Sequence, residues 1–313
     1  MLRNVLTLIR WQNLVFIAIL MYVMHAWVAT PILSAFYMSE QLPWWLLTLL
    51  TLATMLIAAG GYVINDYFDA KIDRINRPDQ QIVTRFVSKE QAMHLFIGLT
   101  AVGVILGLVA ALLTHSTVLA GIYVLTPGLL WFYSASYKRQ FIIGNLIIAF
   151  SSALVPLIIA IATVSLLPEG AQQSAVAYYL YLFLGGFGVF AFLTTWVREV
   201  VKDLQDQMGD RELECHTMPI RIGDTWTKIF VTALILAIVA ALVYLNYCVL
   251  PFDHAWNSLS TRYIFFGIIV PLGCELWLLW AARIPSDYKS AQMLMKFIMF
   301  LGVLYSFVIM KLI

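Results

Sequence analysis

Nine long apolar runs follow one another along the chain, and they constrain its fold more than any other feature. They cover, approximately, residues 14–37, 44–67, 93–113, 116–134, 141–163, 177–200, 227–250, 262–282 and 291–312. A helix needs about 20 apolar residues to cross the hydrocarbon core of a bilayer, so each run is long enough for one span. Only 12% of the 313 residues are charged, against about a quarter in soluble domains. We therefore predict an all-α integral membrane protein. It would be a single domain over residues 1–313, a bundle of about nine transmembrane helices with a central cavity that opens under cytoplasmic loops.

The basic residues are distributed unevenly between the two sides of these predicted spans. When successive loops are placed on alternate sides, all 19 Lys and Arg residues except Arg262 and Lys311 fall on the side of the N-terminus. The positive-inside rule then predicts that the N-terminus and the loops after even-numbered spans face the cytoplasm, across the inner membrane if the chain is bacterial. The first run is longer than a signal-peptide core and no small-residue cleavage site follows it, so we expect no removed leader. Cys215, Cys248 and Cys274 are too scattered for a disulfide framework or a zinc site.

Acidic residues concentrate in two loops on the predicted cytoplasmic side, residues 60–90 and residues 196–224. In the first loop, Asn65, Asp69 and Asp73 are spaced i, i+4, i+8, which would place the three side chains on one face of a helix. In the second loop, four acidic residues form a similar stripe: Glu199, Asp203, Asp206 and Asp210. Carboxylate and amide oxygens suit magnesium, which takes one or two carboxylates and completes its shell with water and substrate phosphate. Two acidic faces therefore predict two magnesium sites.

Basic and aromatic residues near these faces fit a prenyl diphosphate as substrate. Arg matches phosphate oxygens with a planar fork, and Lys supplies a compact charge. The candidate bases are Arg10, Arg77, Lys138, Arg139, Arg198 and Lys202. Aromatic faces stabilise an allylic cation and shield it from water. The candidates for that role are Tyr62, Tyr67, Phe68, Trp131, Tyr133 and Trp196.

Each of these features also has a purely structural interpretation. Membrane proteins place charged residues in loops for solubility and topology, and aromatic residues and snorkelling bases are common at membrane interfaces. Arg198 and Lys202 fit equally well a role in offsetting the acidic stripe of their own helix. Two one-faced acidic clusters on the same side of the bilayer nevertheless favour a functional site. No nucleic-acid partner is expected, and membrane lipids are the expected surroundings.

The motifs themselves resemble those of the UbiA-type superfamily of intramembrane prenyltransferases. Residues 65–73 match the pattern NDxxDxxxD, and residues 203–211 look like the second, DxxxD-type signature with its following Arg. The resemblance covers nearly the whole chain. It implies metal and diphosphate contacts at Asn65, Asp69, Asp73, Asp206 and Asp210, with Asp203 as a further metal ligand and the four aspartates 69, 73, 206 and 210 as catalytic residues. It also implies diphosphate binding by Arg10, Arg77 and Lys138, with Mg2+ as cofactor.

The acceptor is the least constrained part of this prediction. Residues 198–206 look most like the geranylgeranylglyceryl phosphate geranylgeranyltransferase branch, which implies a prenylated glycerol phosphate as acceptor and ether-lipid synthesis. Arg139, Arg198 and Lys202 exceed what a diphosphate neutralised by magnesium requires, so they and Tyr133 are candidate substrate contacts. The alternatives are an aromatic quinone precursor of the hydroxybenzoate or dihydroxynaphthoate type, or a tetrapyrrole. An ion-coupled carrier is the non-enzyme alternative, although carrier sites usually lie near the bilayer midplane.

Overall fold

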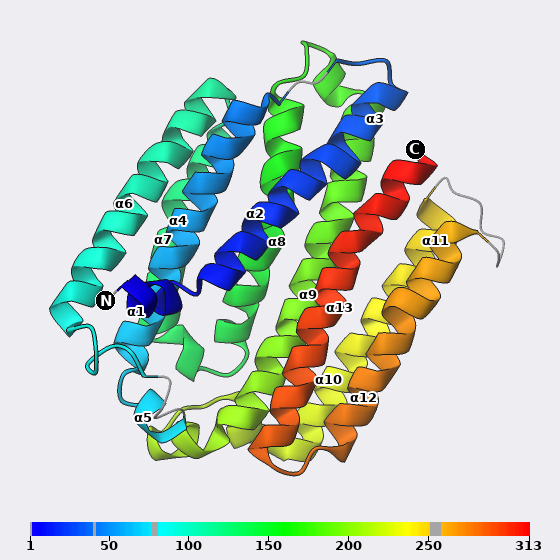
Figure 1. The fold of residues 1–313 in the computed structure, drawn as a ribbon. Helices are drawn as coiled ribbons and strands as arrows, with labels where there is room; N and C mark the ends of the chain where they lie inside the picture. Colours follow the sequence, from blue (N-terminus) through cyan, green and yellow to red (C-terminus); the bar gives the residue numbers. More distant parts are fainter. Residues whose placement is uncertain (1, 40–41, 77–80, 251–257) are drawn as a thin grey trace. The chain divides into compact units, whose positions relative to one another are not determined.

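The structure is a computed structural model that describes residues 2–39, 42–76, 81–250 and 258–313. Within these residues the regular elements are helices (Figure 1): α1 (Leu2–Leu8), α2 (Trp11–Met24), α3 (Thr30–Ala35), α4 (Trp44–Asp69), α5 (Asp73–Asn76), α6 (Lys89–Leu113), α7 (Thr117–Ala135), α8 (Ile143–Ser165), α9 (Ala175–Glu212), α10 (Met218–Tyr244), α11 (Leu259–Arg262), α12 (Val270–Ala281) and α13 (Pro285–Leu312). Three π-helical turns, His25–Ala29, Leu245–Val249 and Tyr263–Ile269, join α2 to α3, extend α10 and join α11 to α12.

The prediction of an all-α membrane protein with about nine spans is confirmed. Nine helical segments of the described chain are long and apolar enough to cross a bilayer, counting α2 with α3 and α11 with α12 as one each. The chain divides into two compact units, and we describe each by itself. The first unit comprises residues 1–140 and 154–185, and the second comprises residues 141–153 and 186–313. The single domain and the central cavity stay predictions.

In the first unit, α4 packs against α2, α6 and α7. Two glycines allow close contact among these helices. A Cβ at Gly60 would lie 2.5 Å from the Thr100 hydroxyl, and a Cβ at Gly107 would lie 2.3 Å from the Tyr123 ring. The Tyr123 hydroxyl in turn donates to the Leu50 carbonyl at 3.2 Å and so ties α7 to α4. Small residues favour such close helix packing in membranes. This packing holds α4, which carries the first acidic motif at its C-terminal end.

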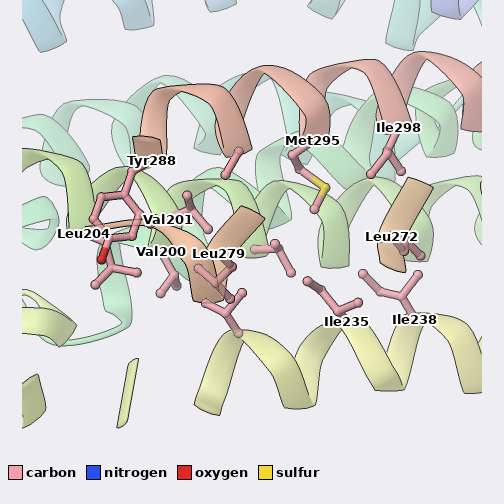
Figure 2. Close-up of a cluster of buried hydrophobic side chains, with 14 of the residues drawn as sticks. Val200, Val201, Leu204, Ile235, Ile238, Leu272, Leu279, Tyr288, Met295 and Ile298 are labelled. Carbon is pink, nitrogen blue, oxygen red and sulfur yellow. The ribbon is translucent and has the colours of Figure 1, made fainter. Parts of the chain in front are cut away.

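In the second unit, α9, α10, α12 and α13 surround a cluster of buried aliphatic side chains. Figure 2 shows Val200 and Val201 of α9 facing Leu279 of α12, with Met295 and Ile298 of α13 further along the same cluster. These five side chains are 0% exposed. The cluster positions the part of α9 in which the second acidic stripe begins.

Helix α9 is much longer than the sixth apolar run. The sixth apolar run ends near residue 200, but α9 continues to Glu212 and has 38 residues. At about 1.5 Å per residue such a helix is about 57 Å long, whereas the hydrocarbon core is about 30 Å thick. The acidic stripe occupies the last four turns of this helix, so it extends beyond the apolar part of the span.

Candidate functional site

The first acidic motif lies where α4 ends. Asn65 and Asp69 are one turn apart, and the Asn65 side-chain amide donates to Asp69 Oδ2 at 2.8 Å. Asp69 Oδ1 accepts from Lys138 Nζ at 2.5 Å. Lys138 reaches this carboxylate from the 3-10 turn Tyr137–Arg139, which follows α7. The predicted metal ligand Asp69 and the predicted diphosphate binder Lys138 are therefore in direct contact.

The expectation that Asn65, Asp69 and Asp73 share one continuous helix face is wrong for Asp73. Helix α4 ends at Asp69, residues 70–72 form a turn, and Asp73 begins the short helix α5. Spacing along the sequence does not reveal such a break, because a carboxylate at i+8 suits both a continuous helix and a new helix start, where acidic residues are favourable.

A second ion pair joins the N-terminal segment to the same end of α4. The Arg10 guanidinium donates to Asp66 Oδ1 at 3.0 Å and lies over the Tyr62 ring, 4.8 Å from its centroid. The Asn13 amide donates to the Tyr62 hydroxyl at 3.2 Å. Arg10 adopts a left-handed conformation, with φ of 50°, at the junction of α1 and α2. These contacts bring the predicted diphosphate binder Arg10 beside the first acidic motif through Asp66, the acidic residue next to Asn65.

The second acidic stripe lies entirely on α9, as predicted. Arg198 donates to Glu199 Oε1 at 2.6 Å, and Lys202 Nζ lies 3.9 Å from Glu199 Oε2. One carboxylate of the stripe is thus paired with two bases of its own helix. Asp203, one turn further, accepts at Oδ2 from the Asn145 amide of α8 at 2.8 Å.

The end of the stripe is fixed by the chain that follows α9. Asp210 is 6% exposed, and its Oδ2 accepts from the Thr217 hydroxyl at 3.0 Å. The backbone N–H of Cys215 donates to the Asp210 carbonyl at 2.9 Å, so the turn between α9 and α10 folds back onto this residue. Thr217 is the residue that precedes α10. Asp206 lies half-buried on α9 between Asp203 and Asp210.

Two further predicted site residues, Tyr133 and Arg139, lie in the first unit. Tyr133 is buried near the end of α7, and Arg139 is exposed in the turn after it. Arg77 lies outside the described residues. The two acidic motifs belong to different compact units, so the prediction that they face each other across one diphosphate stays a prediction.

Two polar residues in direct contact with the second stripe are absent from the predicted set. Asn145 stands in the first turn of α8 in an otherwise apolar run, and Thr217 stands directly before Met218-Pro219. Each carries a local signal. A Thr before a helix with Pro in its first turn is typical of a helix start, and a polar amide in an apolar span is costly unless it has a partner.

The donor chemistry of both motifs fits magnesium. The acidic motifs offer carboxylate and amide oxygens, which are hard ligands. Within the part of the chain that the structure describes, no three His, Cys, Asp or Glu side chains lie close enough to hold a metal ion by themselves. Magnesium does not require such a cage, because it usually takes one or two carboxylates together with water and substrate phosphate.

Known proteins resemble this chain in sequence and in fold. The digeranylgeranylglyceryl phosphate synthase of Ignicoccus hospitalis is 34% identical over 206 residues, which are 66% of this chain. The chain spans 63% of the length of that relative, a little under two thirds. A solved structure of a digeranylgeranylglyceryl phosphate synthase has a TM-score of 0.65 and 23% identity, with 99% of each chain covered.

A second solved structure, of a UbiA homolog from Archaeoglobus fulgidus bound to GPP and Mg2+, has a TM-score of 0.58 and 14% identity. It covers 99% of this chain and 100% of the other. At identities below 25% both structures show a shared fold. The match to the UbiA prenyltransferase family extends over residues 26–304, most of the sequence, and the chain therefore belongs to this family.

Proposed function

We propose that this chain transfers a prenyl group from a prenyl diphosphate to a lipid-soluble acceptor, with magnesium bound at its two acidic helix ends. The observation that carries the proposal is the end of α4, where Asp69 contacts both Asn65 and Lys138. Carboxylate and amide oxygens, which suit magnesium, and a lysine, which suits phosphate, therefore occur together at this helix end. Membership of the UbiA prenyltransferase family supports the same reaction.

The proposed metal ligands come from both units: Asn65, Asp69, Asp73, Asp203, Asp206 and Asp210. The Archaeoglobus fulgidus homolog of the same fold binds Mg2+ together with GPP, which supports the choice of metal. When bound, magnesium ions would stabilise the negative charge of the leaving diphosphate. We assign to Asp69, Asp73, Asp206 and Asp210 the catalytic role, because they are the carboxylates of the two matched motifs.

The bases of the first unit would hold the diphosphate itself. An ammonium group has three N–H donors, so Lys138 can contact a diphosphate oxygen while it remains bonded to Asp69. Arg10 is 36% exposed at its side chain and presents a guanidinium fork suited to phosphate. Arg77, in the Asn76-Arg77-Pro78 run, is the third proposed contact.

Aromatic rings beside the first motif are suited to the allylic end of the substrate. Phe68 packs edge-on against Tyr67 at 5.2 Å and against Trp131 at 5.5 Å, measured between ring centroids. Trp131 also lies 5.4 Å from Phe96. Aromatic faces stabilise cations, and an apolar site excludes water that would capture the allylic cation. This ring cluster favours an enzyme site, at which the prenyl diphosphate is ionised, over a carrier site that only binds an ion.

For the acceptor we propose geranylgeranylglyceryl phosphate. The name of the Ignicoccus hospitalis relative, digeranylgeranylglyceryl phosphate synthase, supports this choice. Arg198 and Lys202 both contact the carboxylate of Glu199, and we propose them as contacts for a second phosphate. Arg139 is exposed after α7 and is a further candidate contact, together with Tyr133.

The test is a purified assay in detergent with magnesium. Farnesyl, geranylgeranyl and longer diphosphates are offered against geranylgeranylglyceryl phosphate, a hydroxybenzoate, a dihydroxynaphthoate and a tetrapyrrole acid, and products are identified by mass spectrometry. We expect magnesium-dependent diphosphate release and a product with two isoprenoid chains on one glycerol phosphate. Prenylation of an aromatic acceptor alone would overturn the acceptor proposal. Absence of transfer to every acceptor, with no diphosphate release, would overturn the enzyme proposal and favour a carrier.

We also propose that the N-terminus and the loops after even-numbered spans face the cytoplasm, as the positive-inside rule predicts. Two exposed positions report on the two sides of the membrane: Ser136 follows the fourth span, and Gln172 follows the fifth. In a variant with Cys248 and Cys274 changed to Ser, a membrane-impermeant maleimide should label Gln172→Cys in intact cells. It should label Ser136→Cys only after permeabilisation. The reverse pattern would invert the orientation.

A further inference from the structure

The carboxylates of the two acidic motifs differ in the kind of group that donates hydrogen bonds to them. In the first unit, Asp66 and Asp69 accept from the cationic side chains of Arg10 and Lys138. Glu199 in the second unit likewise accepts from Arg198. Neutral groups also donate to these carboxylates: Asn65 to Asp69, Thr217 to Asp210 and, from another helix, Asn145 to Asp203.

The contact between Asn145 and Asp203 joins two helices that are distant in sequence. Asn145 lies in the first turn of α8 and is 8% exposed, and Asp203 lies 58 residues later on α9. Both residues belong to the second unit, so the contact is internal to it. The donor–acceptor distance of 2.8 Å lies within the normal range for an N–H···O hydrogen bond.

A neutral donor has a different effect on a carboxylate from that of a cation. A lysine or arginine fixes the orientation of a carboxylate and also cancels its charge. An amide fixes the orientation and leaves the negative charge for a metal ion. Partners of this kind typically change metal affinity by about 10- to 100-fold when they are removed.

We propose that Asn145 is a positioning residue, which holds Asp203 in the orientation that the second acidic stripe needs to bind a magnesium diphosphate. This inference rests on the proposed function. Asn145 itself contacts neither metal nor substrate in this role, and it acts through Asp203. The expected consequence of its loss is weaker binding of magnesium diphosphate with the fold retained.

The test compares Asn145→Leu with Asn246→Leu, which is a matched control in the same unit. Asn246 is 2% exposed, accepts from Ser260 at 2.7 Å and donates to Thr261 at 3.1 Å, next to α11. Both changes remove a buried, hydrogen-bonded amide. The first readout needs no turnover: the rise in melting temperature caused by magnesium with inorganic diphosphate, titrated to give an apparent dissociation constant.

We expect Asn145→Leu to raise this dissociation constant by about tenfold, and Asn246→Leu to lower the melting temperature while leaving the constant unchanged. A second readout is the magnesium requirement for prenyl transfer, which should rise in parallel. In the Asp203→Asn background, Asn145→Leu should add less than about twofold, because the two residues act as one unit.

Two outcomes would overturn the inference: an unchanged dissociation constant in a folded Asn145→Leu protein, or an undiminished effect in the Asp203→Asn background. Either result can occur with wild-type transfer intact, in which case the proposed function stands. Conversely, the wild-type protein could bind magnesium diphosphate and transfer no prenyl group. That result would refute the proposed function, and the binding measurements alone would then decide the role of Asn145.

Discussion

At the scale of single residues, Asp69 has the most consequential contacts in the first unit. Its carboxylate accepts one bond from an amide and one from an ammonium, and it is 17% exposed at its side chain. We expect Asp69→Asn to lower the rate of prenyl transfer by about 100-fold or more, comparable to the loss of one essential electrostatic contact. Glu90→Gln, an exposed acid on α6, is the control and should retain activity. The measurement is transfer at saturating magnesium together with the melting temperature, and a near-normal rate for Asp69→Asn would remove this residue from the site.

Glu275 on α12 is the clearest case of a buried polar group without a visible partner. It is 0% exposed, and within the described residues neither carboxylate oxygen has a hydrogen-bond partner. Its neighbours one turn away on α12, Leu272 and Leu279, belong to the aliphatic cluster of the second unit. A buried polar group left unsatisfied costs about 1–3 kcal/mol, so we expect Glu275→Leu to raise the free energy of unfolding by about that amount. A fall in the melting temperature of Glu275→Leu would instead indicate that this carboxyl has a partner in the membrane.

At the scale of helices, one buried lysine holds the end of α12. Lys228 of α10 is 8% exposed, donates to the Ala282 carbonyl at 2.9 Å and lies 5.3 Å from the centroid of the Tyr288 ring. A cation at a helix C-terminus satisfies carbonyls that have no partner within the helix. We expect Lys228→Met to lower the free energy of unfolding by about 1.5–3 kcal/mol, the range for hydrogen bonds to charged groups. Lys289→Met, at an exposed position of α13, is the control and should change stability by less than about 0.5 kcal/mol. Equal effects of the two changes would contradict this role.

The helices also show what the sequence predicts and what it does not. Hydrophobic runs predict the nine spans, because lipid imposes a minimum length of apolar helix. The spacing of the acidic stripe predicts that the sixth helix continues past its apolar run to Asp210, but the apolar pattern does not mark the end of α9 at Glu212, because the residues beyond the run are polar. The break after Asp69 is missed for a related reason, because residues 65–73 are compatible with one helix or two.

The candidate site also has a part that the sequence predicts and a part that it does not. The acidic residues are found from sequence because their spacing is local and repeats with the helical period. The contacts that reach them from other helices are not found in this way, because these partners lie far along the chain: Arg10 is 56 residues from Asp66, and Asn145 is 58 residues from Asp203. Such contacts depend on how the helices pack, which the spacing of residues on one helix does not determine.

At the scale of the whole molecule, two of the three limits between the compact units fall inside helices. One lies between Ala153 and Leu154 in α8, and another lies between Gly185 and Gly186 in α9, while the third lies between Gln140 and Phe141, before α8 begins. Separable domains meet instead at exposed linkers that few contacts cross. Since two continuous helices each contribute to both units, we propose that residues 1–313 form a single domain, as the sequence analysis predicts.

This organisation predicts that the two units unfold together. Loss of α8 or α9 from one unit would remove a helix from the other, so neither unit can lose its packing alone. We expect one calorimetric transition in detergent, and we expect destabilising changes in the two units to shift it alike.

Gly107→Leu tests the first unit, where even a Cβ would lie 2.3 Å from the Tyr123 ring, and Gly302→Leu tests the second, where a Cβ would lie 2.1 Å from the Phe190 ring. Overpacking typically costs about 1–3 kcal/mol, enough to separate two transitions if the units were independent. A variant in which one half of the heat absorption moves to lower temperature while the other half stays in place would show two domains.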